Sequence, residues 1–249
     1  MTELSAFAEV QAAFERGDHP DVLRRTETIL AERPGDDAAH ELRARSLLAV
    51  GRVREAEAEA ENAVRLDPDE IRYRELLAEV LASEGAHRDA ADEYRRLAAG
   101  DPRQAEWTVA EARERLGAAQ PEMGIDAARR ALRLDPQNAT AQLALAQGLT
   151  RLGQPRPALE AALRAAALQP EDPAAQETLA DARWLVGEEA EALEGYRALA
   201  GRLSGSGREA VLQKARTLVR LRSGWLGRLV CRVPLLFELA LRNGWLRVS

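Results

Sequence analysis

Small and apolar residues recur along the chain in a fixed order, and a proline closes each round of the pattern. The phrases "AVRLDPDEIR" at residues 63–72 and "ALRLDPQNAT" at residues 131–140 are two copies of the same boundary. The prolines of this series stand 34 residues apart without an insertion, at Pro34, Pro68, Pro102, Pro136 and Pro170. The next step falls on Ser204, where the series stops. Such self-similarity at a fixed period indicates a repeat protein.

Other positions keep a fixed distance from each proline and predict how a unit folds. Seventeen residues before it the chain has Gly17, Gly51, Gly85, Ala119 and Gly153, and Gly187 keeps this distance from Ser204. Twenty-four residues before it the chain has Val10, Ala44, Ala78, Ala112 and Ala146, and Ala180 keeps this distance from Ser204. The glycine predicts a turn between a first and a second helix of about 14 residues each. The proline ends the second helix, and the small residues allow the helices to approach closely.

The residue types agree with a helical chain. Alanine, leucine, glutamate and arginine dominate and are strong helix formers, whereas runs with period-two alternation are missing. A pair of such short helices cannot bury its apolar face alone, so it is expected to stack on its neighbours. The sequence therefore predicts an all-α array of helix pairs.

This unit resembles the tetratricopeptide repeat, which has 34 residues, two helices, small residues at the helix crossings and a closing proline. In "AQLALAQGLTRLGQPRPALEAALRAAALQP" the match lies at Leu145, Ala146, Leu149, Gly153, Ala158, Ala162, Ala165 and Pro170, and Tyr94 and Tyr196 fall where the family favours an aromatic residue. The resemblance implies a right-handed α-solenoid and six repeats, at residues 3–36, 37–70, 71–104, 105–138, 139–172 and 173–206. Departures from the pattern are Val22 and Thr26 in the first repeat, Ala119 in the fourth, and the missing proline of the sixth.

Charge is divided unevenly along the chain. The net charge is −6, but residues 208–249 carry +7 and residues 1–207 carry −13. An acidic body argues against nucleic acid as its main partner, because phosphate binding needs a basic face. The single cysteine, Cys231, allows no disulfide within one chain, and the N-terminal residues lack the pattern of a signal peptide. We therefore expect a cytoplasmic protein.

Residues with catalytic or metal-binding chemistry do not gather in the sequence. His19, His40 and His87 stand outside metal-ligand spacing of one another, and there is no zinc motif, nucleophile elbow or phosphate loop. The abundant glutamates alternate with arginine at helical spacing, as on a solvated helix face. We expect no enzyme activity, no metal and no cofactor.

The resemblance also implies a concave groove lined by the first helices, where family members bind peptides. The residues at the matching positions are Glu41, Arg45, Glu75, Glu79, Arg113, Gln147 and Asp181, with Trp184 one turn further. The basic clamp with which chaperone-binding members hold a terminal carboxylate is not found here. A mixed, acidic groove favours a basic or amphipathic helix as the partner, in a non-catalytic adaptor or assembly scaffold.

The C-terminal segment breaks the pattern. Residues 204–207, "SGSG", are expected to form a flexible connector, 208–222 a further first helix, and 207–249 as a whole a basic amphipathic helical extension. Its candidate interaction residues are Trp225, Leu229, Leu236, Phe237 and Trp245. Charges interrupt every long apolar run, so a membrane-spanning helix is not expected. Three roles fit: a cap on the last repeat, an anchor on an anionic membrane surface, or a segment that docks into a partner or a second copy.

Overall fold

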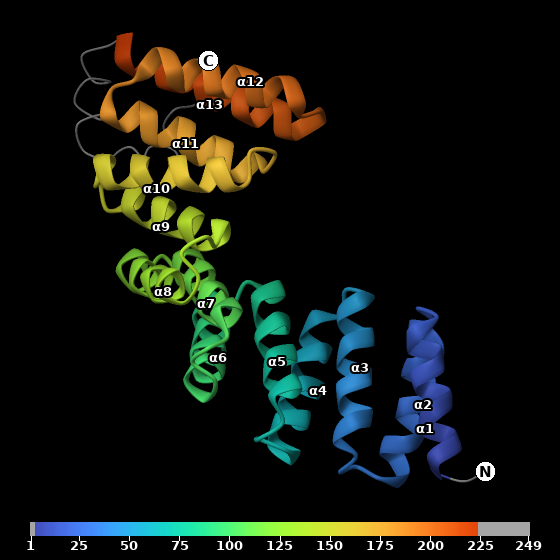
Figure 1. The fold of residues 1–249 in the computed structure, drawn as a ribbon. Coiled ribbons are helices and arrows are strands. Elements are labelled where there is room, and N and C mark those ends of the chain that lie inside the picture. The colour runs from blue at the N-terminus through green and yellow to red at the C-terminus, as the bar shows by residue number, and fades with distance from the viewer. Residues whose placement is uncertain (1–2, 224–249) are drawn as a thin grey trace. The chain divides into compact units, whose positions relative to one another are not determined.

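The computed structural model describes residues 3–223, and every regular element in that range is an α-helix (Figure 1). The helices are α1 (Glu3–Glu15), α2 (His19–Glu32), α3 (Asp37–Ala49), α4 (Val53–Leu66), α5 (Ile71–Glu84), α6 (His87–Gly100), α7 (Ala105–Gly117), α8 (Pro121–Leu134), α9 (Ala139–Arg151), α10 (Pro155–Leu168), α11 (Pro173–Val186), α12 (Glu189–Arg202) and α13 (Gly205–Ser223). Within each of the two units described below, helices that follow one another in the chain pack together. The predicted all-α repeat fold is confirmed.

The turn inside each pair is made by one residue with a left-handed backbone. Gly17, Gly51, Gly85, Gly153 and Gly187 have φ between 67° and 94°, a region in which only glycine is free of steric cost. In the turn after α7, Ala119 takes the same conformation with φ of 56°. The fixed glycine spacing of the sequence therefore corresponds to a real backbone requirement, which an alanine meets under strain at residue 119.

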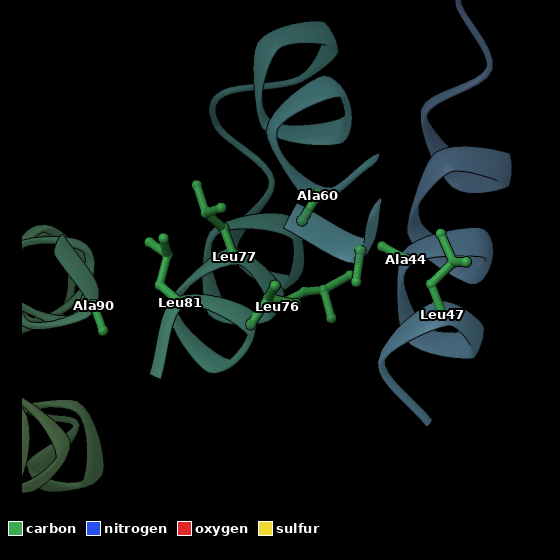
Figure 2. Close-up of a cluster of buried hydrophobic side chains, with 9 residues drawn as sticks. Ala44, Leu47, Ala60, Leu76, Leu77, Leu81 and Ala90 are labelled. Atoms are coloured by element: carbon green, nitrogen blue, oxygen red, sulfur yellow. The ribbon is translucent and has the colours of Figure 1, made fainter. Parts of the chain in front are cut away.

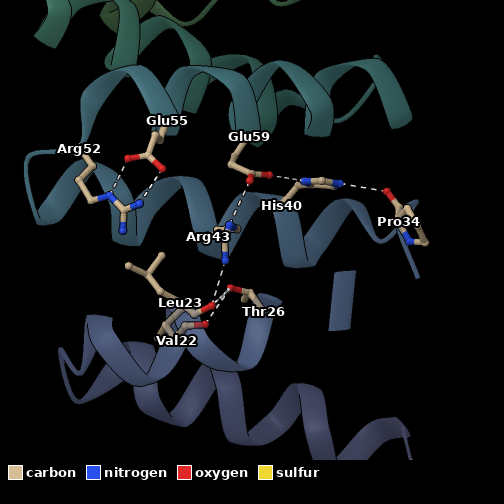
Figure 3. A network of polar contacts seen from close by, with 9 residues as sticks. All are labelled: Val22, Leu23, Thr26, Pro34, His40, Arg43, Arg52, Glu55 and Glu59. Atoms are coloured by element: carbon tan, nitrogen blue, oxygen red, sulfur yellow. Dashed lines mark hydrogen bonds and ion pairs between the residues drawn. The ribbon is translucent and has the colours of Figure 1, made fainter. Parts of the chain in front are cut away.

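The boundary between one pair and the next is held by hydrogen bonds to the carbonyl of the closing proline. The fourth residue of the unit reaches this carbonyl in three places: Arg74 Nη2 donates to Pro68 O at 3.2 Å, Gln176 Nε2 donates to Pro170 O at 3.0 Å, and His40 Nε2 lies 3.1 Å from Pro34 O. His40 also lies 2.5 Å from Glu59 on α4, which accepts from Arg43 as well (Figure 3). These contacts therefore join the first helix of a unit to the preceding proline, at the point where that proline ends the earlier helix.

Small side chains fill the helix crossings. The alanines at the predicted crossing positions, Ala44, Ala78, Ala112, Ala146 and Ala180, are at most 1% exposed. Ala44 and the larger side chains of Leu47, Leu76, Leu77 and Leu81 belong to one core cluster, in which Leu77 and Leu81 lie toward Ala90 (Figure 2). Each cluster is local to a few neighbouring helices, as expected when repeats contact only their neighbours.

The described helices form two compact units that divide after Ala118. The N-terminal unit contains α1–α7 and the C-terminal unit α8–α13. At the end of the C-terminal unit, only Leu203 and Ser204 separate α12 from α13, so Gly205 and Gly207 belong to a helix where the sequence predicts a flexible connector. The helix includes these residues because α13 continues into a segment, from Val211 onward, that packs on the C-terminal unit. Within residues 3–223, no helix is long and apolar enough to cross a membrane.

Candidate functional site

In the N-terminal unit, the predicted groove residues lie on the first helices and pair with their own chain. Glu41 of α3 is 6% exposed and accepts from Arg45 Nε at 3.1 Å, and its second oxygen lies 3.4 Å from Arg72 Nη1 of α5. Glu75 of α5 accepts from the indole N–H of Trp107 on α7. A ligand on this face would have to compete with these contacts.

The remaining two predicted residues of this unit are more open. Glu79 on α5 is exposed, and Arg113 on α7 is exposed with its Nε 3.0 Å from Glu114 Oε1. The structure therefore places all five residues on α3, α5 and α7. Glu41 pairs directly with Arg45, and Glu75, Glu79 and Arg113 all act electrostatically on the Tyr94 hydroxyl.

In the C-terminal unit, two predicted residues line one hollow. This hollow has a volume of about 270 Å³ and is lined by Gln147, Thr150 and Arg151 of α9 and by Ala174, Glu177, Thr178 and Asp181 of α11. Gln147 and Asp181 are sequence-predicted groove residues, and they come from first helices 34 positions apart. The lining offers hydroxyl, amide, guanidinium and carboxylate groups, which suits recognition of a polar or charged segment.

A lysine from α13 holds the acidic edge of this hollow. Lys214 Nζ donates to Glu177 Oε1 and to Asp181 Oδ2, both at 2.7 Å. The Tyr196 hydroxyl of α12 donates to the other oxygen of Asp181, and the Lys214 ammonium lies 5.9 Å from the centre of the Tyr196 ring. Three helices therefore meet at one carboxylate.

The charges in this cluster change the protonation behaviour of its members. Burial raises the pKa of the Asp181 carboxyl, against the opposing influence of Lys214 and Tyr196. Burial by itself lowers the pKa of Lys214, but the carboxylates of Asp181 and Glu177 outweigh it and raise that pKa above its usual 10.5. Burial and Asp181 raise the pKa of the Tyr196 hydroxyl. Lys214 is therefore a stable ammonium ion at neutral pH.

Trp184 does not lie in a groove, which corrects the sequence-based prediction. Its side chain is 8% exposed and belongs to a core cluster with Tyr196, Leu199, Val211 and Leu218. The reason is the position of α13, whose apolar face covers the indole. The candidate tail residues Trp225, Leu229, Leu236, Phe237 and Trp245 lie outside the described residues.

Sequence reasoning missed Lys214, although a signal was present. Lys214 stands 34 residues after Ala180, at the position where four earlier units also carry alanine. A lysine in a slot otherwise reserved for a small residue indicates that α13 is not packed like the earlier first helices. Among the described residues no group of three His, Cys, Asp or Glu side chains could hold a metal ion.

Known proteins agree with this architecture. Residues 13–80 match the family model described as tetratricopeptide repeat. No curated protein matches the chain in sequence. Among solved structures, a tetratricopeptide repeat protein from Parabacteroides merdae has a TM-score of 0.74 at 14% identity, covering 93% of this chain and 96% of that chain.

Two further solved structures share the fold at similarly low sequence identity. MamA from Desulfovibrio magneticus has a TM-score of 0.61 at 19% identity, covering 67% of this chain and 94% of that chain. YrrB, described as a TPR protein with an unusual peptide-binding site, has a TM-score of 0.57 at 15% identity, covering 76% and 97%. The repeat spacing, the tetratricopeptide-repeat match over residues 13–80 and these solved structures therefore agree on a fold of tetratricopeptide-type helix pairs.

Proposed function

We propose that the chain is a non-catalytic adaptor or assembly scaffold that binds a segment of another protein against the first helices α9 and α11. The observation that carries this proposal is the hollow lined by polar groups from both helices, with Gln147 and Asp181 on its two sides. A linear segment that lies across α9 and α11 would contact the residues that line this hollow. The peptide-binding site named for YrrB supports the proposal by analogy of fold.

Filling the hollow tests this function. Ala174 is an exposed residue of the hollow's lining, so Ala174→Arg adds a long side chain at the site without opening the core. Ala167 is also exposed but lies on the second helix α10, outside the lining, so Ala167→Arg is a matched control. Peptides selected on the full chain from a random 15-residue library should lose most of their affinity for the Ala174→Arg variant and keep it for Ala167→Arg.

Two outcomes would contradict the proposal. The first is a selection that yields no peptide specific for the folded chain. The second is a set of peptides that bind both arginine variants equally, because the hollow would then have no part in recognition. Circular dichroism of both variants shows whether the helices are intact.

The basic C-terminal segment supports a second proposal, namely a contact with an anionic membrane surface or with a second copy of the chain. Residues 208–249 carry +7 against an acidic body. The test replaces Arg228, Arg232 and Arg242 together by Glu in the full chain. Co-sedimentation with phosphatidylserine vesicles would fall if the segment is an anchor, whereas the mass measured by light scattering would fall if it joins copies. No change in either measurement would eliminate both roles.

A further inference from the structure

The helix α13 contacts the proposed binding surface itself. The two carboxylates that receive Lys214, Glu177 and Asp181, are also lining residues of the hollow. Two acidic residues of the binding surface are therefore already paired with a cation from the same chain.

The rest of α13 has the residue pattern of a basic amphipathic helix, the class of ligand expected for that surface. Val211, Ala215 and Leu218 stand three residues before, one after and four after Lys214, and all three are buried. They pack in the core cluster with Trp184 and Tyr196. Arg208, Gln213 and Arg216 of the same helix are exposed. α13 is thus a basic amphipathic helix with one lysine placed among its apolar residues.

The connection between α12 and α13 along the chain is short. Leu203 and Ser204 are the only residues between α12 and α13, and Gly205 begins α13 with a left-handed φ of 57°. Gly207 lies in the first turn, and glycine lowers the cost of changing the backbone there. Release of α13 would need a backbone change in this connector and the loss of its contacts through Val211, Leu218 and Lys214.

We propose that α13 is an internal competitor for the hollow. The partner is a basic amphipathic segment whose lysine or arginine replaces Lys214 as the ion-pair partner of Glu177 and Asp181. This inference rests on the proposed function and names the class of its partner. Removing Lys214 without replacement leaves two partly buried carboxylates uncompensated, which is costly. A ligand ammonium or guanidinium restores the pairing, so exchange of one cation for another avoids that cost. An acidic or neutral ligand provides no such compensation.

The experiment uses a fluorescent peptide with the sequence of residues 205–223, titrated with the full chain and followed by anisotropy. Its apparent dissociation constant depends on the fraction of chains whose own α13 has left the surface. Two variants raise that fraction in different ways. Lys214→Met removes the resident cation, and Leu218→Ala weakens the apolar contact and leaves both carboxylates in place. Each should bind the peptide on the order of tenfold more tightly than the unaltered chain.

Two controls define the result. Arg216 is an exposed cation on the same helix, and Arg216→Met should leave the affinity unchanged. In the Lys214→Met chain, the added changes Glu177→Gln and Asp181→Asn should abolish the gain, because the surface has lost its charge. Circular dichroism and thermal melts confirm that each variant is folded.

The proposal is overturned if Lys214→Met and Leu218→Ala, both folded, bind the peptide no better than the unaltered chain. It is also overturned if library peptides that depend on the hollow carry no basic residue, a result that would leave the adaptor function intact. Failure of every peptide to bind the hollow, in contrast, would remove the proposed function itself.

Discussion

Two glutamates one helical turn apart on α4 illustrate how environment decides the value of an ion pair. Glu59 is 20% exposed and accepts from both His40 and Arg43, whose side chains are mostly buried. Glu55 is 56% exposed and pairs with Arg52, which is 49% exposed (Figure 3). Water screens the second pair, and the first pair is largely shielded from it.

We predict that Glu59→Gln lowers the free energy of unfolding by about 1–2 kcal/mol, because His40 and Arg43 lose their shared acceptor charge. The matched change Glu55→Gln alters the same residue type on the same helix and should have no measurable effect. Urea denaturation of both variants gives the comparison. Equal effects would mean that burial does not distinguish the two pairs.

The left-handed turn residues give a second pair of opposite predictions. Ala119→Gly relieves the steric cost of a positive φ and should stabilise the chain by about 1 kcal/mol. Gly85→Ala imposes that cost at a φ of 85°, where open space surrounds the added methyl group, and should destabilise by a similar amount. Thermal melts of the two variants should shift in opposite directions. Shifts of the same sign would show that φ is not the controlling factor.

At the scale of elements, the behaviour of α13 depends on the charge of Lys214. The pKa of Lys214 is higher in the folded chain than its usual 10.5, because Asp181 and Glu177 favour the ammonium ion in opposition to burial. Its contribution to stability is therefore complete below pH 10.5 and is lost as the pH rises through the folded value. Alkaline pH should release α13 before it melts the other helices of the unit.

Trp184 provides the measurement, since α13 covers its ring. In a chain where Trp107, Trp225 and Trp245 are replaced by Phe, the emission of Trp184 should shift to longer wavelength above pH 10.5. The variant Lys214→Arg keeps its charge at this pH and should shift less. Identical pH profiles for lysine and arginine would show that another group controls the release.

At the scale of the whole molecule, the division after Ala118 predicts that a core substitution destabilises mainly the unit that contains it. Leu47→Ala removes a fully buried side chain from the core cluster of α3–α5, at a cost of about 2–5 kcal/mol. Leu199→Ala does the same in the C-terminal unit. Hydrogen exchange should lose protection mainly in the unit that carries the change. Equal loss in both units would indicate a single cooperative fold.

How far the sequence predicts this molecule differs between fold and site. The 34-residue period predicts the helix pairs and the turn residues, because each depends on a local backbone requirement that one residue type satisfies. It also places Gln147 and Asp181 on equivalent faces of two first helices. The burial of Trp184 and the contact of Lys214 depend on how α13 docks, which a repeat pattern cannot specify once the pattern has ended.

The alanine-filled helix crossings have a practical consequence for mapping this protein. More than half of the buried apolar residues in the described part of the chain are alanines, so alanine scanning has nothing to remove at most core positions. Such a scan would report a tolerant interior where the helices are in fact in closest contact. Enlarging substitutions are the informative probe, because one added methyl or isopropyl group at a crossing must separate two helices, typically at about 1–3 kcal/mol. Natural variants that harm the fold are accordingly expected among replacements of alanine by larger residues.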